Sequence, residues 1–144
     1  FYNCGKLTNL QIPDSVTSFG NFVIGGTYGK TQWEYNPVEK KLTVTGNGAM
    51  GEPYVEGSTT EKNASRVPWN RYRDQIEEVV IEEGVVNLST YALHGMTSLT
   101  AVTLPSTLEE IGEGSFESCT ALTYICIPDS VKTIDIMRSV IVKD

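Results

Sequence analysis

A set of apolar residues recurs every 23 positions, and this spacing constrains the fold more than any other feature of the chain. Residues 93–115 and 116–135 align at that spacing, and residues 76–88 and 1–20 repeat much of the same set. The matched pairs of the first two copies are Leu99/Leu122, Val102/Ile125, Leu104/Ile127, Pro105/Pro128, Leu108/Val131 and Ile111/Ile134. Agreement at six positions or more in four copies indicates a repeat protein.

The pattern within each copy predicts a short strand followed by a turn. Two apolar residues spaced two apart share one face of a strand, and Pro105 then ends the strand because proline donates no ladder hydrogen bond. Gly112 permits the returning turn. One such coil cannot bury its apolar side alone, so we expect stacked coils with a common core. Amphipathic helices are the alternative, which the central proline and the β-branched residues disfavour. We therefore predict a mostly β fold with short helical turns, a right-handed solenoid of short parallel strands.

The repeat carries a family resemblance. Phe116 and Cys119 open one copy of F-x-x-C-x-x-L-x-x-[IL]-x-[IL]-P, and the first twenty residues hold another. This pattern resembles the BspA-like leucine-rich repeat, also called the Treponema pallidum type, over residues 1–20 and 76–135. The resemblance implies a large bacterial protein that is secreted or anchored at the cell surface. The better understood members of the family are adhesins that bind host matrix or other cells.

The period divides the chain into three regions. Residues 1–20 form one leucine-rich repeat, residues 21–75 interrupt the period, and residues 76–144 hold further repeats with an atypical C-terminal tail. The tail departs from the pattern after residue 135 and predicts either a terminal strand or a truncated repeat in another register. Neither end shows the polar capping coil that such arrays need, so we expect the chain to be cut from a longer protein.

The interrupting region contains a predicted β-hairpin. Residues 32–35 and 41–45 alternate polar and apolar side chains on either side of a turn-forming N-P-V-E-K sequence. Their apolar face is too small to be stable alone, so we expect it to pack on the solenoid. Residues 51–66 are polar and predict a long, mobile loop, and Pro68 starts a short helix. The whole region is either a cap that shields the repeat core or a ligand platform built from aromatic side chains.

Composition disfavours several classes of function. The net charge of −7, from 11 basic and 18 acidic residues, argues against binding of nucleic acid. No apolar run approaches the roughly 20 residues of a membrane span, so we expect no membrane insertion. The one histidine, His94, is expected in an exposed turn, and Cys119 is expected to be a buried free thiol. Adjacent acids such as Glu77 and Glu78 point to opposite sides and predict a solvated acidic face. We predict no catalytic residue, no metal and no cofactor.

The outward side chains of the predicted strands are the candidate ligand-binding surface. They are Tyr124, Asn9, Gln11, Glu78, Val80, Ala101, Thr103 and Cys126. Tyr124 is the first choice because aromatic side chains are favoured binding anchors. The leading hypothesis is a non-catalytic, extracellular or cell-surface recognition module that binds a host or cell-surface protein or glycan through this face. The alternative is a spacer that presents another domain and has no ligand. An enzyme is disfavoured because no acid, base and nucleophile converge, and the sequence leaves the ligand and the oligomeric state open.

Overall fold

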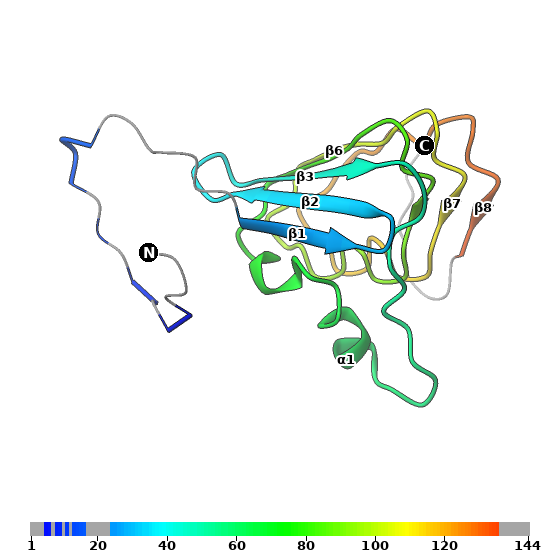
Figure 1. Cartoon of the computed structure of the whole chain (residues 1–144), viewed down its shortest axis with the longest axis horizontal. Helices are drawn as coiled ribbons and strands as arrows, with labels where there is room; N and C mark the ends of the chain where they lie inside the picture. Colours follow the sequence, from blue (N-terminus) through cyan, green and yellow to red (C-terminus); the bar gives the residue numbers. More distant parts are fainter. Residues whose placement is uncertain (1–4, 7, 10, 12, 17–23, 136–144) are drawn as a thin grey trace.

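The computed structural model describes residues 24–135 and, before them, residues 5, 6, 8, 9, 11 and 13–16 of the 144 in the chain. Strands dominate these residues and helix is scarce, as the repeat predicts (Figure 1). The elements are β1 (Ile24–Tyr28), β2 (Thr31–Asn36), β3 (Lys41–Gly46), α1 (Thr60–Ala64), the 3-10 helix η1 (Asn70–Tyr72), β4 (Glu78–Ile81), β5 (Asn87–Leu88), β6 (Ala101–Thr103), β7 (Glu110–Ile111) and β8 (Thr133–Ile134). The short helix expected after Pro68 is present as η1.

Strands of successive repeats lie side by side in parallel. β4 pairs with β6, so that Glu78 lies beside Ala101 and Val80 beside Thr103. A second sheet joins β5, β7 and β8, again in parallel and with partners that are one repeat apart in the sequence. Equivalent strands of consecutive repeats are therefore neighbours, as the sequence predicts, and we call the segment that each repeat forms a coil.

The turns between the strands recur with the same period. Tyr91 and Gly114 occupy equivalent positions of consecutive repeats and have φ angles of 56° and 61°. Gly95 and Ser118 are related in the same way, with φ angles of 71° and 63°. Left-handed backbone favours glycine because other residues have a Cβ that meets the following carbonyl oxygen. Ser118 therefore adopts a conformation that its own side chain disfavours.

Replacing Ser118 by glycine is expected to stabilise the protein by up to about 1 kcal/mol. The Ser118 side chain is exposed, so its loss removes little packing, and the gain is reduced by the greater freedom of glycine in the unfolded chain. Urea denaturation measures the change, with Ser118→Ala as the matched control that keeps the Cβ. A glycine variant no more stable than the alanine variant would contradict the expectation.

The hairpin extends the repeat sheet at one edge. β2 and β3 pair antiparallel at the residues that the alternation predicts, and Asn36 begins their connecting turn. The Oδ1 atom of Asn36 accepts hydrogen bonds from the backbone N–H groups of Val38 and Glu39, at 3.0 and 3.1 Å. β1 pairs antiparallel with β2, and β3 pairs in parallel with β4, which gives the strand order β1-β2-β3-β4-β6. The sequence predicts that the hairpin packs on the solenoid, but not that it joins the sheet.

One hydrophobic core continues from the hairpin into the coils. Its buried side chains include Trp33, Tyr35, Leu42, Val44, Trp69, Val79, Ile81, Leu88, Leu93, Met96, Leu99, Leu108 and Ile111. Trp69 is fully buried, and its Nε1–H donates a hydrogen bond to the carbonyl oxygen of Ala92 at 2.7 Å. The rings of Tyr28 and Trp33 approach that of Trp69 edge-on, with centroids 5.3 and 6.0 Å away. The aromatic residues of the interrupting region thus add to the repeat core.

Residues 51–66 are not a loop throughout, because α1 lies within them. The Oγ1 atom of Thr59 caps this helix by accepting a hydrogen bond from the backbone N–H of Lys62 at 3.3 Å. Asn63 is buried, and its Oδ1 accepts a hydrogen bond from the backbone N–H of Val55 at 3.1 Å. So short a polar helix shows no apolar periodicity, and for that reason the sequence predicts only a loop there.

The last described coil keeps the predicted alternation without forming the predicted strand. Ile125 and Ile127 are half-buried, whereas Tyr124 and Cys126 are exposed. The backbone of these residues belongs to neither sheet. The terminal strand expected within residues 136–144 lies outside the described residues.

The described part of the first predicted repeat also lies outside both sheets. Asn9 and Gln11 are exposed, and no described residue between 5 and 16 belongs to a strand. β1 forms the edge of the sheet on this side and is antiparallel to β2. Asn9 and Gln11 themselves lie outside the repeat sheets, and residues 10 and 12 of the strand predicted there lie outside the described residues.

Candidate ligand-binding surface

The outer face of the five-stranded sheet combines side chains from the hairpin and from the repeats. Every second side chain of a strand points to the same face, and the strand register aligns these side chains into rows. One row is Glu34, Thr43, Val80 and Thr103, and the next is Asn36, Lys41, Glu78 and Ala101. All of these residues are exposed or half-buried. We call this the sheet face.

The structure brings half of the predicted surface residues together. The four on the sheet face are Glu78, Val80, Ala101 and Thr103. Tyr124, the first choice, is 69% exposed, but it lies with Cys126 on the coil beyond the last strand of the sheet. Asn9 and Gln11 are exposed and lie outside both sheets, so they do not contribute to the sheet face.

Sequence reasoning missed the hairpin half of the sheet face. Glu34, Lys41 and Thr43 point outward from β2 and β3 and lie in register with the repeat residues. The signal was available in the alternation that assigns Trp33 and Leu42 to the opposite, inward face. The missing information was the parallel pairing of β3 with β4, because alternation assigns residues to faces without assigning strands to neighbours.

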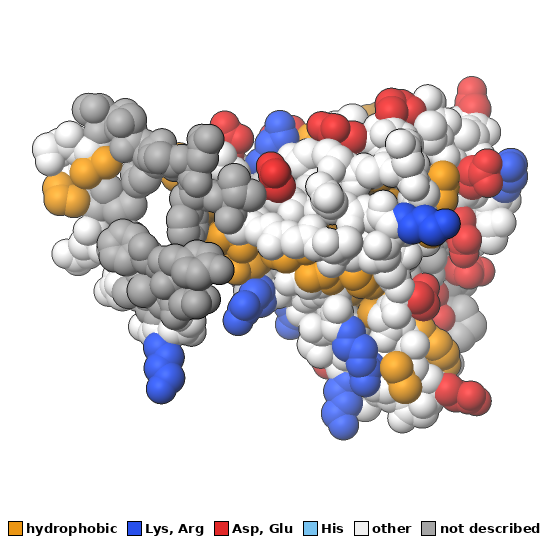
Figure 2. Space-filling model, viewed as in Figure 1, with side chains coloured by type: hydrophobic (Ala, Val, Ile, Leu, Met, Phe, Trp, Pro, Cys, Tyr) orange, Lys and Arg blue, Asp and Glu red, His pale blue; other side chains and the backbone are white. Residues whose placement is uncertain are grey.

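The middle of the sheet face carries short, uncharged side chains. Thr43, Val80 and Thr103 are adjacent across three strands, and they offer two hydroxyl groups around one aliphatic group. Figure 2 looks onto β1, β2 and β3 and shows mainly uncharged atoms over the middle of these strands, with carboxylates above them. Such a surface can donate and accept hydrogen bonds while burying little charge.

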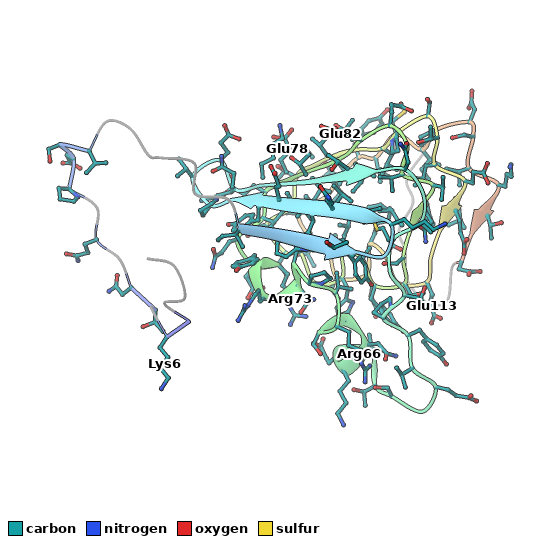
Figure 3. The ribbon with its side chains drawn as sticks, in the orientation of Figure 1. Lys6, Arg66, Arg73, Glu78, Glu82 and Glu113 are labelled. Carbon is teal, nitrogen blue, oxygen red and sulfur yellow. The ribbon has the colours of Figure 1, made fainter. Side chains whose placement is uncertain are left out.

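Charged residues lie at both ends of β4, on either side of Val80. Glu78 begins this strand and Glu82 follows its last residue, and Figure 3 labels both along the upper part of the view. Nearby, the Nζ atom of Lys40 donates a hydrogen bond to Oε1 of Glu77 at 2.9 Å, which raises the pKa of Lys40. Both partners are exposed, so this ion pair contributes little to stability.

Some of the acidic residues bind the following coil. Glu83 accepts hydrogen bonds from the backbone N–H of Ser106 at 2.8 Å and from its hydroxyl at 2.9 Å. The backbone hydrogen bond, followed by that of the hydroxyl, lowers the pKa of Glu83. The Nζ atom of Lys132 likewise lies 3.1 Å from Oε1 of Glu109. Because each partner lies one repeat further along the chain, these acids connect neighbouring coils in addition to facing solvent.

His94 is buried, which corrects the prediction of an exposed turn histidine. Its exposed fraction is 5%, and its Nε2 lies 3.1 Å from Oε1 of Glu61 in α1. The segment that contains α1 covers the turn, and the sequence predicts only a loop there.

The described part of the chain offers neither a cluster of metal ligands nor a membrane-spanning helix. Within it, His, Cys, Asp and Glu side chains form no group of three that could hold a metal ion. None of the helices within residues 24–135 has the length and apolar character needed to cross a membrane.

The two described cysteines differ in environment. Both are free thiols, Cys126 is exposed as predicted, and Cys119 is half-buried with its Sγ–H directed at the carbonyl oxygen of Leu93 at 3.1 Å. Burial raises the pKa of the Cys119 thiol from an ordinary value of 9.0 to about 11. Cys4 lies outside the described residues.

Iodoacetamide at mildly alkaline pH is expected to alkylate Cys126 much faster than Cys119. The raised pKa of Cys119 lowers its thiolate fraction about 100-fold relative to an ordinary thiol, and burial limits access further. Peptide mass spectrometry over a time course measures both rates, and the chain unfolded in urea is the control in which the rates converge. Equal rates in the folded protein would contradict the placement of Cys119.

A known family of repeat proteins matches most of the chain. The BspA type Leucine rich repeat region matches the chain in six copies, over residues 1–49 and 71–137. The chain belongs to this family. The match includes β1, β2 and β3, and it leaves out the segment that contains α1. None of the curated proteins matches the chain.

Solved structures of leucine-rich repeat proteins resemble this BspA-type chain. One is a leucine-rich repeat protein from Eubacterium ventriosum, with 26% identity and a TM-score of 0.63 over 77% of this chain and 28% of that one. The T. pallidum leucine-rich repeat protein has 23% identity and a TM-score of 0.44, over 73% and 50%. A leucine-rich cell surface protein from Faecalibacterium prausnitzii has 26% identity and a TM-score of 0.45, over 78% and 33%. The chain thus spans between 28% and 50% of the length of these proteins.

Proposed function

We propose that this chain is a non-catalytic recognition module of a bacterial surface protein, and that it binds a host or cell-surface protein or glycan through the sheet face. The observation that carries the proposal is the continuity of this face from β2 to β6, across hairpin and repeats. Membership of the BspA-type family supports an extracellular or cell-surface location, as the sequence resemblance implies.

The physical character of the sheet face favours recognition. Its backbone is held by hydrogen bonds between neighbouring strands, so a ligand would order few groups that are not already ordered. Thr43, Val80 and Thr103 give its centre short side chains with little rotamer entropy to lose on binding. A binding surface needs a central area that excludes water and polar groups around it, and Glu78 and Glu82, at the two ends of β4, supply such groups.

The test is a binding screen with the complete chain, against immobilised extracellular matrix proteins, a glycan array and whole cells. The variant Thr43→Arg/Thr103→Arg places two long cations on the sheet face. Its matched control, Thr97→Arg/Thr120→Arg, makes the same change at two exposed positions outside the strands. For any ligand that binds saturably, the face variant is expected to weaken binding at least about tenfold, while the control stays close to the parent chain.

Two results would count against the proposal. If no surface in the screen binds the chain saturably, the repeats act as a spacer that presents another domain. If both double variants weaken binding equally, the bound surface lies elsewhere on the molecule or the added charge alone is responsible.

A further inference from the structure

His94 lies between two carboxylates that come from different parts of the fold. Its ring belongs to the turn after β5, and Nε2 lies 3.1 Å from Oε1 of Glu61 in α1. On the other side of the ring, Nδ1 lies 3.7 Å from Oε2 of Glu117, in the equivalent turn of the next coil. Only 6% of the His94 side chain is exposed, whereas 67% of the Glu61 side chain is exposed, so water reaches this carboxylate but hardly reaches the ring.

Glu61 connects α1 to the repeats through both of its oxygens. While Oε1 meets His94, Oε2 lies 3.2 Å from Nη1 of Arg73. The side chain of Arg73 crosses the turn at Gly95, where an added Cβ would lie 3.2 Å from its Cδ. The edge of the Tyr91 ring also contacts His94, with centroids 5.7 Å apart. The charged and titratable groups around the ring are therefore two carboxylates, one guanidinium and one phenol.

α1 in turn holds the loop that precedes it. The Oδ1 atom of Asn63 accepts hydrogen bonds from the backbone N–H of Val55 at 3.1 Å and from Nη1 of Arg66 at 2.6 Å. This loop presents two exposed apolar side chains, Tyr54 at 51% and Val55 at 47% exposure. Arg66 and Arg73 lie on the same side of the molecule, away from Glu78 (Figure 3). The loop is thus connected through Asn63 to the same helix that carries Glu61.

A neutral imidazole satisfies only one of the two carboxylates. When the hydrogen is on Nε2, it is donated to Glu61, and the lone pair of Nδ1 faces Glu117 with no hydrogen-bond partner. A second proton gives Nδ1 a hydrogen to direct at Glu117 and gives the ring a charge opposite to that of both carboxylates. Histidine ordinarily gains this proton between about pH 5 and 8.

We propose that His94 is a pH-sensitive latch, which holds α1 and the loop with Tyr54 and Val55 more tightly in mild acid than at alkaline pH. The tightening comes from the buried ring of His94, whose Nε2 faces Glu61 and whose unpartnered Nδ1 faces Glu117. Protonation of the ring strengthens the contact of α1 with the repeat turns, and loss of the proton weakens it.

The latch has a lower pH limit that Glu61 sets. Hydrogen bonds from His94, and then from Arg73, lower the pKa of Glu61 from its ordinary value of 4.5. A carboxyl whose pKa is lowered by folding stabilises the fold above its unfolded pKa, and this contribution disappears as the pH falls through the folded pKa. The latch is therefore complete in mild acid, and it is lost only as the pH falls below 4.5 and through the lowered pKa of Glu61 in the folded protein.

Hydrogen–deuterium exchange of the complete chain tests the latch. Peptides from residues 52–66 are compared near pH 6 and near pH 8, after correction for intrinsic exchange rates. Their protection is expected to be about fivefold greater at the lower pH. In His94→Gln, which can donate to Glu61 but gains no proton, the ratio is expected to fall to about one. Peptides from β2 and β3 serve as the internal control and should show no such ratio.

Three results would overturn the proposal. They are an absent pH effect in the parent chain, the full effect retained in His94→Gln, or an equal effect in the β2–β3 peptides, which would indicate a change of global stability. If His94→Gln does not fold, Glu117→Gln decides, because it keeps His94 and removes only the second carboxylate. The parent ratio is expected to shrink in this variant, and an unchanged ratio counts against the latch.

Discussion

Trp69→Ala is expected to destabilise the protein by about 3–5 kcal/mol, the largest effect of any single substitution described here. Trp69 is fully buried, and its ring joins the aromatic residues of the hairpin to the first coil of the repeats. Alanine leaves a large cavity and removes the donor to the carbonyl oxygen of Ala92. Urea denaturation followed by far-ultraviolet circular dichroism measures the loss without relying on tryptophan fluorescence.

Trp69→Phe separates packing from hydrogen bonding at the same position. Phenylalanine keeps an aromatic ring but leaves the buried Ala92 carbonyl without its donor, which costs about 1–3 kcal/mol. The phenylalanine variant is therefore expected to lie between the parent chain and Trp69→Ala. A loss below about 1 kcal/mol for Trp69→Ala would mean that the aromatic cluster does not join hairpin and repeats.

Gly112→Ala is expected to destabilise the protein by about 2–3 kcal/mol, although it adds a single methyl group. Gly112 lies against the backbone of the preceding coil, and its N–H donates a hydrogen bond to the carbonyl oxygen of Leu88 at 2.8 Å. An added Cβ would lie 2.7 Å from the backbone nitrogen of Thr90 and 2.9 Å from the carbonyl carbon of Ser89. Both contacts are with backbone, so the two coils must separate to admit it.

Gly5→Ala is the matched control for Gly112→Ala. An added Cβ at Gly5 meets no heavy atom within 4 Å, so the change is expected to stay within about 0.5 kcal/mol of the parent chain. Denaturation of both variants under the same conditions gives the comparison. Equal stability of the two variants would show that the coils are further apart at Gly112 than the structure has them.

The pairing of equivalent strands was predictable because each copy of the repeat carries the same pattern of apolar residues. Leu108 and Ile111 predict the inward side of the chain after Pro105, and both are buried. The register of β4 against β6 follows directly from the spacing of the repeat. A periodic sequence supplies the offset between partners several times over, so chance resemblance at one copy has little influence.

The placement of the hairpin was less predictable. Trp33 and Tyr35 are inward, as their alternation indicates, but nothing in a hairpin sequence specifies which strand its outer edge will meet. The pairing of β3 with β4 depends on backbone groups that every residue carries. For this reason, the sequence alone does not place Thr43 and its neighbours on the same face as the repeat residues.

The environment of His94 could not be predicted for a different reason. In the aligned repeat its position corresponds to Glu117, an ordinary turn residue. Its burial results from α1, a short helix with no apolar stripe, whose Glu61 reaches the turn from a distant part of the sequence. Tertiary contacts of this kind leave no local pattern for sequence reasoning to find.

Nuclear Overhauser contacts between β3 and β4 in solution test the central claim most directly, namely that hairpin and repeats form one sheet with one outer face. We expect cross-strand backbone contacts between the strand partners Leu42/Val79 and Thr43/Val80, together with those of the repeat pair Val80/Thr103. Contacts within the hairpin and within the repeats, with none between β3 and β4, would contradict the claim. The hairpin would then pack on the solenoid without extending its sheet, and the sheet face would end at β4.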